Sequence, residues 1–127
     1  MRQRYRKKAD QFVIAVQLNL DTAGLHYRKW GGEQHAKQGD WLVDNNGDVY
    51  TVEQASFAKT YKQLSAGTYL KITPVWAEKT LVSGSVQTKE GHSHYVAGDY
   101  LVSNNEDGSD AYCIGATQFN AMYERDQ

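Results

Sequence analysis

GDWLVDNN, residues 39–46, returns as GDYLVSNN at residues 98–105, 59 residues further along the chain. Similarity at a fixed offset is typical of an internal duplication. Beyond these stretches the offset grows to 62 residues, and there it pairs Phe57 with Phe119. The repetition predicts two copies of one structural unit, the second with a slightly longer hairpin.

The boundaries of the two copies follow from where the matching residues end. We expect a basic N-terminal arm at residues 1–10, a first unit at residues 11–64, and a second unit with a short C-terminal tail at residues 65–127. A unit of roughly 55 residues is only marginally stable alone, because it buries too little of its surface. We therefore expect the copies to pack on each other about a pseudo-twofold axis, as one globule.

Alternation of apolar residues predicts a strand over residues 12–20. Phe12, Ile14 and Val16 share one face of this strand, and Val13 and Ala15 share the other. A period of two residues is the pattern of a strand with one buried face. We expect the face that carries Phe12 to be the buried one.

Further patterns complete the predicted fold. Gly31-Gly32 and Asn46-Gly47 are typical hairpin turns, and Phe57 and Tyr61 lie four residues apart, as on one helix face. Pro74 interrupts an expected strand at residues 70–77 and should mark an edge or a bend. The predicted class is a β-rich α+β fold, with two tandem five-stranded antiparallel units that are each closed by a short helix.

Composition excludes several classes of protein. The 14 Lys and Arg residues balance 15 Asp and Glu residues, so no global charge attracts nucleic acid or an anionic membrane. The single cysteine, Cys113, has no partner for an intramolecular disulfide. No apolar run approaches the roughly 18 residues of a membrane span, and no export signal is evident. We expect a cytoplasmic protein without a cofactor.

The first copy contains Tyr5-Arg6-Lys7-Lys8 before Ala15-Val16-Gln17, then the GDWLV stretch and a closing Phe57-Ala58-Lys59-Thr60-Tyr61. In these motifs it resembles a group of small bacteriophage and prophage proteins. Ala9 stands where members of this group usually have proline. The resemblance implies a phage or mobile-element origin and brings no catalytic residues with it.

The leading functional prediction is a non-catalytic binding module. It would engage a host or phage protein or a small molecule through the seam between the two copies, because clefts at such junctions are common ligand sites. A homo-oligomer is a further possibility. The candidate contact residues are one cation and four aromatic residues: Arg28, Trp30, Trp41, Trp76 and Tyr100.

Two alternatives belong to other classes. His92 and His94 stand two residues apart and could bind a metal with Asp99 or Asp110, as in a small hydrolase or nuclease. The basic run could instead grip nucleic-acid phosphates through Arg2, Arg4, Arg6, Lys7 and Lys8. The non-functional interpretations are a structural role in the fold for His94 and a solvated tail for the basic run. Asp40 and Asp99 each follow glycine, and we interpret both as turn residues.

Overall fold

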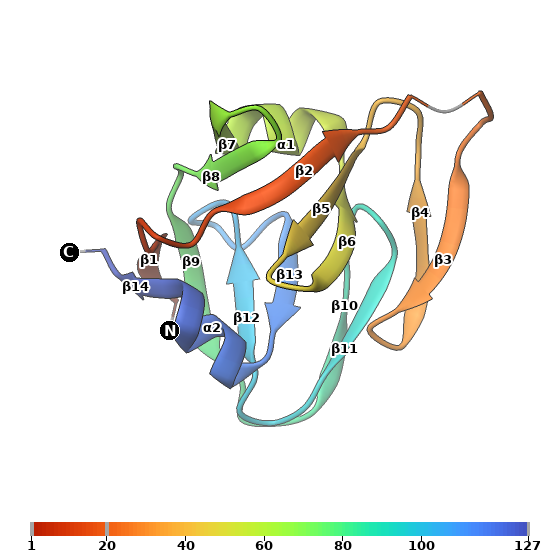
Figure 1. The fold of residues 1–127 in the computed structure, drawn as a ribbon. Coiled ribbons are helices and arrows are strands. Elements are labelled where there is room, and N and C mark those ends of the chain that lie inside the picture. Colours follow the sequence, from red (N-terminus) through yellow and green to blue (C-terminus); the bar gives the residue numbers. More distant parts are fainter. Residues whose placement is uncertain (1, 20, 127) are drawn as a thin grey trace.

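The structure is a computed structural model that describes residues 2–19 and 21–126. Within these residues it contains 14 strands and two short helices. Ten strands form two five-stranded antiparallel sheets, and the other four form two β-hairpins (Figure 1). The predicted β-rich class with antiparallel sheets is therefore confirmed.

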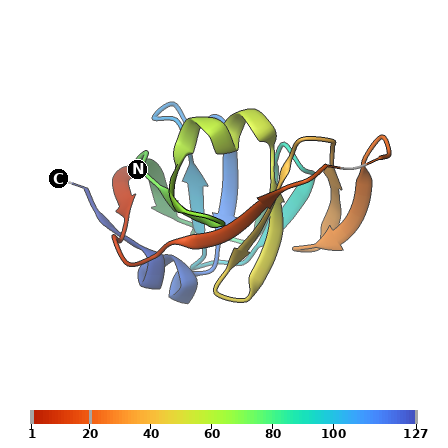
Figure 2. The same ribbon diagram turned by 45° about the horizontal axis from the view of Figure 1, so that its top comes forward.

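Sheet 1 contains, in spatial order, β6 (Asp48–Val52), β5 (Trp41–Asn45), β2 (Val13–Gln17), β8 (Thr68–Lys71) and β7 (Tyr61–Ser65). Sheet 2 contains β13 (Ala111–Ile114), β12 (Tyr100–Ser103), β9 (Val75–Lys79), β1 (Gln3–Lys7) and β14 (Tyr123–Arg125). The hairpins are β3 (Leu25–Lys29) with β4 (Gly32–Ala36), and β10 (Gly84–Gln87) with β11 (His92–Tyr95). The helices are α1 (Gln54–Thr60) and α2 (Ala116–Met122), which lie on opposite sides of the molecule (Figure 2).

The two sheets exchange strands. β1 lies between β9 and β14, so the first strand of the chain belongs to the sheet of the C-terminal half. β8 lies between β2 and β7 and so belongs to the sheet of the N-terminal half. The expected free basic arm is therefore wrong for residues 3–7, because both edges of β1 pair with neighbouring strands. The chain termini accordingly lie on the same side of the molecule (Figure 1).

Each sheet packs its inner face against one helix. On sheet 1, Phe57 of α1 stacks on Trp41 with ring centroids 4.1 Å apart. On sheet 2, Phe119 of α2 stacks on Tyr100, also at 4.1 Å. Both phenylalanines are buried in separate hydrophobic clusters. The molecule consequently has two apolar cores, one beneath each helix.

The buried face of β2 is the opposite of the predicted one. Val13 and Ala15 are 1% and 7% exposed, whereas Phe12, Ile14 and Val16 are 47%, 51% and 56% exposed. The inner face already holds the rings of Phe57, Trp41 and Tyr69, so small side chains fit beneath them. Leu20, at the end of the expected strand, lies outside the described residues.

The structure confirms one of the two predicted hairpin turns as placed and shifts the other by one residue. The Asn46-Gly47 hairpin is confirmed, with φ of 55° and 93° at its two residues. The other predicted turn lies one residue earlier, at Trp30-Gly31, with φ of 56° and 77°. The chain bends near Pro74 as expected, but the predicted strand at residues 70–77 is divided between two sheets.

The closing tyrosines lie on strands. Tyr61 and Tyr123 directly follow the helices and are the first residues of β7 and β14. In both places the phenylalanine four residues earlier is on the helix, and the two rings stack. The spacing of four residues between phenylalanine and tyrosine therefore predicted a real ring contact, although the two rings belong to a helix and to the strand that follows it. Among the described residues, none of the helices combines the length and apolar character needed to cross a membrane.

Candidate functional site

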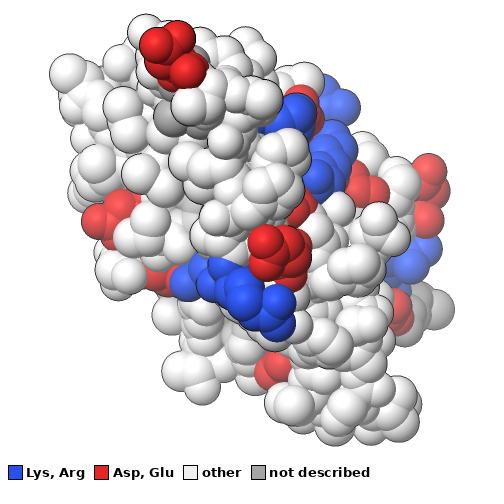
Figure 3. All heavy atoms as spheres, turned by 90° about the vertical axis from the view of Figure 1, so that its right-hand side faces the viewer, with Lys and Arg blue, Asp and Glu red and all other residues white. Residues whose placement is uncertain are grey.

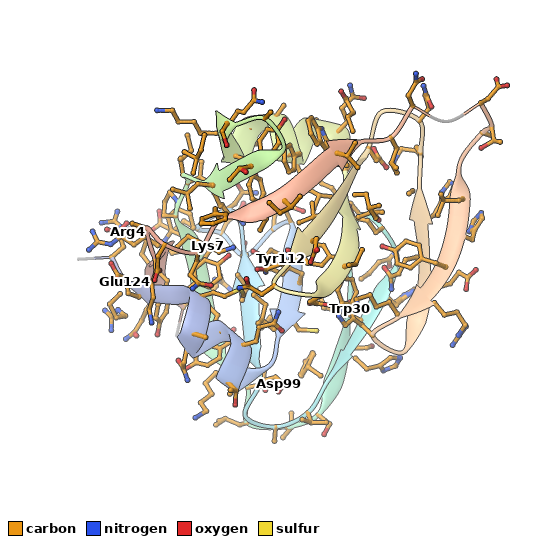
Figure 4. The ribbon with its side chains drawn as sticks, in the orientation of Figure 1. Arg4, Lys7, Trp30, Asp99, Tyr112 and Glu124 are labelled. Carbon is orange, nitrogen blue, oxygen red and sulfur yellow. The ribbon has the colours of Figure 1, made fainter. Side chains whose placement is uncertain are left out.

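A cavity of about 270 Å³ lies at the seam between the two sheets. Its lining comes from both sheets and both hairpins, and we call it the seam cavity. The polar centre of its wall consists of two lysines and four tyrosines: Lys7, Lys71, Tyr50, Tyr61, Tyr112 and Tyr123. Figure 4 shows Lys7 directed from β1 toward the interior and Tyr112, whereas Arg4 of the same strand lies at the periphery.

Strand alternation positions the two lysines. In β1, Tyr5 and Lys7 point inward, and Arg4 and Arg6 point out toward acidic residues of the C-terminal segment. Lys7 lies directly opposite Tyr123 in the sheet 2 register. In sheet 1, Lys71 likewise lies opposite Tyr61. Each sheet thus presents a lysine and a tyrosine side by side to the cavity.

Lys7 has an unusual environment for a charged residue. It is 8% exposed, and its ammonium, which is not itself fully buried, forms no hydrogen bond with the described residues. Its Nζ lies 5.7 Å from the centroid of the Tyr123 ring. Burial, helped by repulsion from the Lys71 charge, lowers the pKa of Lys7 to about 8. At neutral pH Lys7 therefore still carries its charge, at a considerable free-energy cost.

Lys71, in contrast, is well satisfied. Its Nζ donates to Asn104 Oδ1 at 2.6 Å and to the Tyr112 hydroxyl at 3.0 Å. Its ammonium also lies 5.3 Å from the centroid of the Tyr112 ring. These bonds orient Lys71 and leave Lys7 as the unpartnered cation of the pair.

The four cavity tyrosines are hydrogen-bond donors at neutral pH. Burial is the main reason that the pKa of Tyr50, Tyr61, Tyr112 and Tyr123 lies above its usual value. The Tyr50 hydroxyl accepts from Asn45 Nδ2 at 3.5 Å, and the Tyr112 hydroxyl accepts from Lys71 Nζ at 3.0 Å. Because they stay protonated, each phenol can donate a hydrogen bond without adding negative charge.

The carboxylates of the cavity lining already have partners, and one of them, Glu90, accepts from the Glu53 amide at 2.9 Å. Asp48 binds Lys29 at 2.8 Å, and Asp110 accepts a hydrogen bond from Asn104 Nδ2 at 2.8 Å. Lys89 lies 3.8 Å from the same Asp110 carboxylate. Viewed from the β3–β4 side, Lys and Arg adjoin Asp and Glu, and neither sign of charge dominates the face (Figure 3).

The predicted contact residues are dispersed. Trp30 is on the cavity wall, 5.7 Å from the Tyr50 ring between centroids. Trp41 and Tyr100 lie within the two apolar clusters. Arg28 is exposed and pairs with Glu33 at 3.8 Å, and Trp76 lines a separate hollow near Arg2 and Arg4. Only Trp30 of these five lines the seam cavity.

His92 and His94 are both exposed on β11, and His94 lies on the cavity lining. No group of three or more His, Cys, Asp or Glu side chains suitable for a metal is present among residues 2–19 and 21–126. Burial raises the pKa of the Cys113 thiol, which disfavours the nucleophilic thiolate.

Asp40 and Asp99 are turn residues, as predicted. Asp40 Oδ2 accepts from the Lys37 amide at 2.8 Å, and Asp99 Oδ2 accepts from the Val96 amide at 3.0 Å. Asp40 also accepts from the Gln54 amide at 3.1 Å, which ties this turn to the start of α1. Their carboxylates are occupied by backbone amides.

The basic N-terminal run is held in the fold. Arg4 pairs with Asp126 at 3.2 Å, and Arg6 pairs with Glu124 at 2.7 Å. Lys8 Nζ donates to the Asn120 carbonyl at 3.0 Å. Nucleic-acid binding through this run stays a prediction, and it would have to compete with these contacts.

Sequence reasoning missed the centre of the cavity. A partial signal was present, because Tyr5-Arg6-Lys7 and Tyr69-Leu70-Lys71 repeat a Tyr-x-Lys pattern 64 residues apart, although Tyr27-Arg28-Lys29 shows it too. In a strand, residues two apart share a face, so each pattern places a lysine beside a tyrosine. Comparison with known proteins adds nothing to this geometry, since no family model, no curated protein and no solved structure matches the chain.

Proposed function

We propose that the protein is a non-catalytic binding module whose ligand is a small molecule held in the seam cavity. The observation that carries this proposal is the largely buried side chain of Lys7 on the wall of a 270 Å³ cavity, whose ammonium forms no hydrogen bond with the described residues and is not itself fully buried. An unpaired buried charge destabilises a fold, and such features persist at functional sites rather than in structural cores. The volume is near the lower end of ligand pockets, roughly 300–1,000 Å³, which favours a small ligand.

We further propose that the site arose by duplication of one unit with pseudo-twofold symmetry. In support, the orders β6-β5-β2-β8-β7 and β13-β12-β9-β1-β14 correspond strand for strand along the chain. The exchanged strands β1 and β8 then occupy equivalent places and supply Lys7 and Lys71. A duplicated unit would thus deliver each type of cavity residue twice, once from each side.

Five groups of the lining are unsuited to act as ionised nucleophiles. Cys113 and the four cavity phenols are protonated at neutral pH, and burial raises their pKa further. The likeness to small phage proteins supports an origin as an accessory protein of a phage or mobile element. Its ligand would then be a small molecule of the bacterial cytoplasm.

A retention experiment tests the binding proposal. The purified protein is incubated with a bacterial metabolite extract, dialysed and denatured, and the released compounds are identified by mass spectrometry. Trp30→Asn removes an indole from the cavity wall, and asparagine tolerates the positive φ at that position. We expect retained compounds that fall at least several-fold in Trp30→Asn.

The matched control is Trp76→Thr, which removes an indole outside the seam cavity. This variant should retain the same compounds as the wild-type protein. Retention of no compound by the wild-type protein would contradict the proposal, and so would equal retention by Trp30→Asn.

A further inference from the structure

We propose that the ligand of the seam cavity is a small oxyanion, either inorganic phosphate or a metabolite that presents a phosphate or carboxylate group to Lys7. This inference rests on the proposed function, and it names the chemistry that the site recognises.

Six side chains of the cavity lining carry hydrogen-bond donors and no negative charge at neutral pH. Lys7 and Lys71 are ammonium groups without acceptor capacity, and four protonated phenols stand around them. Lys71 donates two hydrogen bonds, one to Asn104 and one to Tyr112. The three N–H groups of Lys7 have no acceptor among the described residues. An oxyanion supplies several acceptor oxygens at once and would satisfy this surplus.

The charges of the cavity lining also favour an anionic ligand. Lys7 is buried beside a second cation, and that neighbour contributes to the lowering of its pKa. The carboxylates of the lining are engaged elsewhere: Asp48 pairs with Lys29 and Asp110 with Asn104 and Lys89, whereas Glu90 and Asp99 accept from the backbone amides of Glu53 and Val96. No carboxylate of the described residues forms an ion pair with Lys7 or Lys71. A bound anion would supply the missing negative charge.

The position of Lys7 suits recognition rather than folding. Arg4 and Arg6 on the same strand make ion pairs at the surface, so β1 gains nothing further from a third cation that points inward. A methionine at position 7 would fill a similar volume without a charge and would pack against Tyr123. A costly lysine at this position is the pattern expected when stability is given up for binding.

Isothermal titration calorimetry with inorganic phosphate at pH 7 and constant ionic strength tests the inference. We expect saturable binding at one site in the wild-type protein. Lys7→Met should weaken it by about 10-fold or more, since hydrogen bonds that involve a charged group are stronger than those between neutral groups. Lys7→Gln keeps a polar side chain and should lose the same affinity. The control Lys62→Met removes an exposed lysine of β7 and should bind as the wild-type protein does.

Thermal unfolding separates binding from folding. The unfolding midpoint of Lys7→Met should equal or exceed that of the wild-type protein in the absence of phosphate, because a buried charge has been removed. Phosphate should raise the midpoint of the wild-type protein and leave that of Lys7→Met unchanged. A loss of binding together with equal or higher stability supports a recognition role for Lys7.

The outcomes distinguish this inference from the binding proposal. If the wild-type protein binds neither phosphate nor acetate but retains metabolites in a manner that depends on Trp30, the oxyanion inference is wrong and the binding proposal stands. Wild-type phosphate affinity in both Lys7 variants also overturns the inference. If neither anions nor metabolites bind, both proposals fall.

Discussion

Removal of residues 2–8 is expected to abolish cooperative folding. β1 lies inside sheet 2, and its loss leaves β9 and β14 with unpaired backbone groups. The deletion also removes Tyr5, whose ring meets that of Phe119 at 4.9 Å between centroids. Urea denaturation followed by circular dichroism should show no cooperative transition in the truncated chain.

The control for this deletion changes charge and leaves the strand in place. Arg4→Gln with Arg6→Gln removes two exposed cations and should unfold at nearly the wild-type urea concentration. A truncated chain that unfolds as cooperatively as the wild-type protein would show that residues 2–8 are a dispensable arm. The double variant is also the appropriate test of nucleic-acid binding, because it does not disturb the fold.

Phe119→Ala should be the most destabilising single substitution that we predict. Phe119 is 0% exposed and contacts Tyr5, Tyr100 and Tyr123. Truncation of a fully buried phenylalanine costs about 3–5 kcal/mol, through lost transfer free energy and the cavity left behind. Equilibrium unfolding in urea measures this loss directly.

Phe12→Ala is the matched control, because the sequence pattern predicted Phe12 as buried and the structure leaves it 47% exposed. Its free energy of unfolding should fall by about 1 kcal/mol or less. A larger loss for Phe12→Ala than for Phe119→Ala would mean that β2 faces the other way.

The fold class could be predicted because it depends on local patterns. Alternation indicated the strands, and Asn46-Gly47 indicated its hairpin without any knowledge of the rest of the chain. The orientation of β2 could not be predicted in the same way, because residues 12–16 are apolar on both faces. Residues far away in the sequence determine which face of β2 is buried. The rings of Trp41 and Phe57 occupy the inner face and leave room only for Val13 and Ala15.

The exchange of β1 and β8 was also beyond local reasoning. Pairing of β1 with β14 joins residues more than 100 positions apart, as in Arg6 with Glu124, and no local signal specifies such a partner. Lys7 was accordingly assigned to a solvated basic run, since lysine is rarely buried without a partner. Trp30 was named for its place beside a hairpin turn, and that turn does lie at the cavity.

The central claim is that Lys7 is a buried cation without a partner, positioned to receive an anion. Nuclear magnetic resonance of isotope-labelled lysine side chains, titrated with and without phosphate, measures this most directly, with Lys7→Met for assignment. We expect one lysine to lose its proton near pH 8 rather than near 10.5, and its pKa to rise when phosphate is added, because the anion favours the charged form. Titration of every lysine near its ordinary value, unchanged by phosphate, would contradict it.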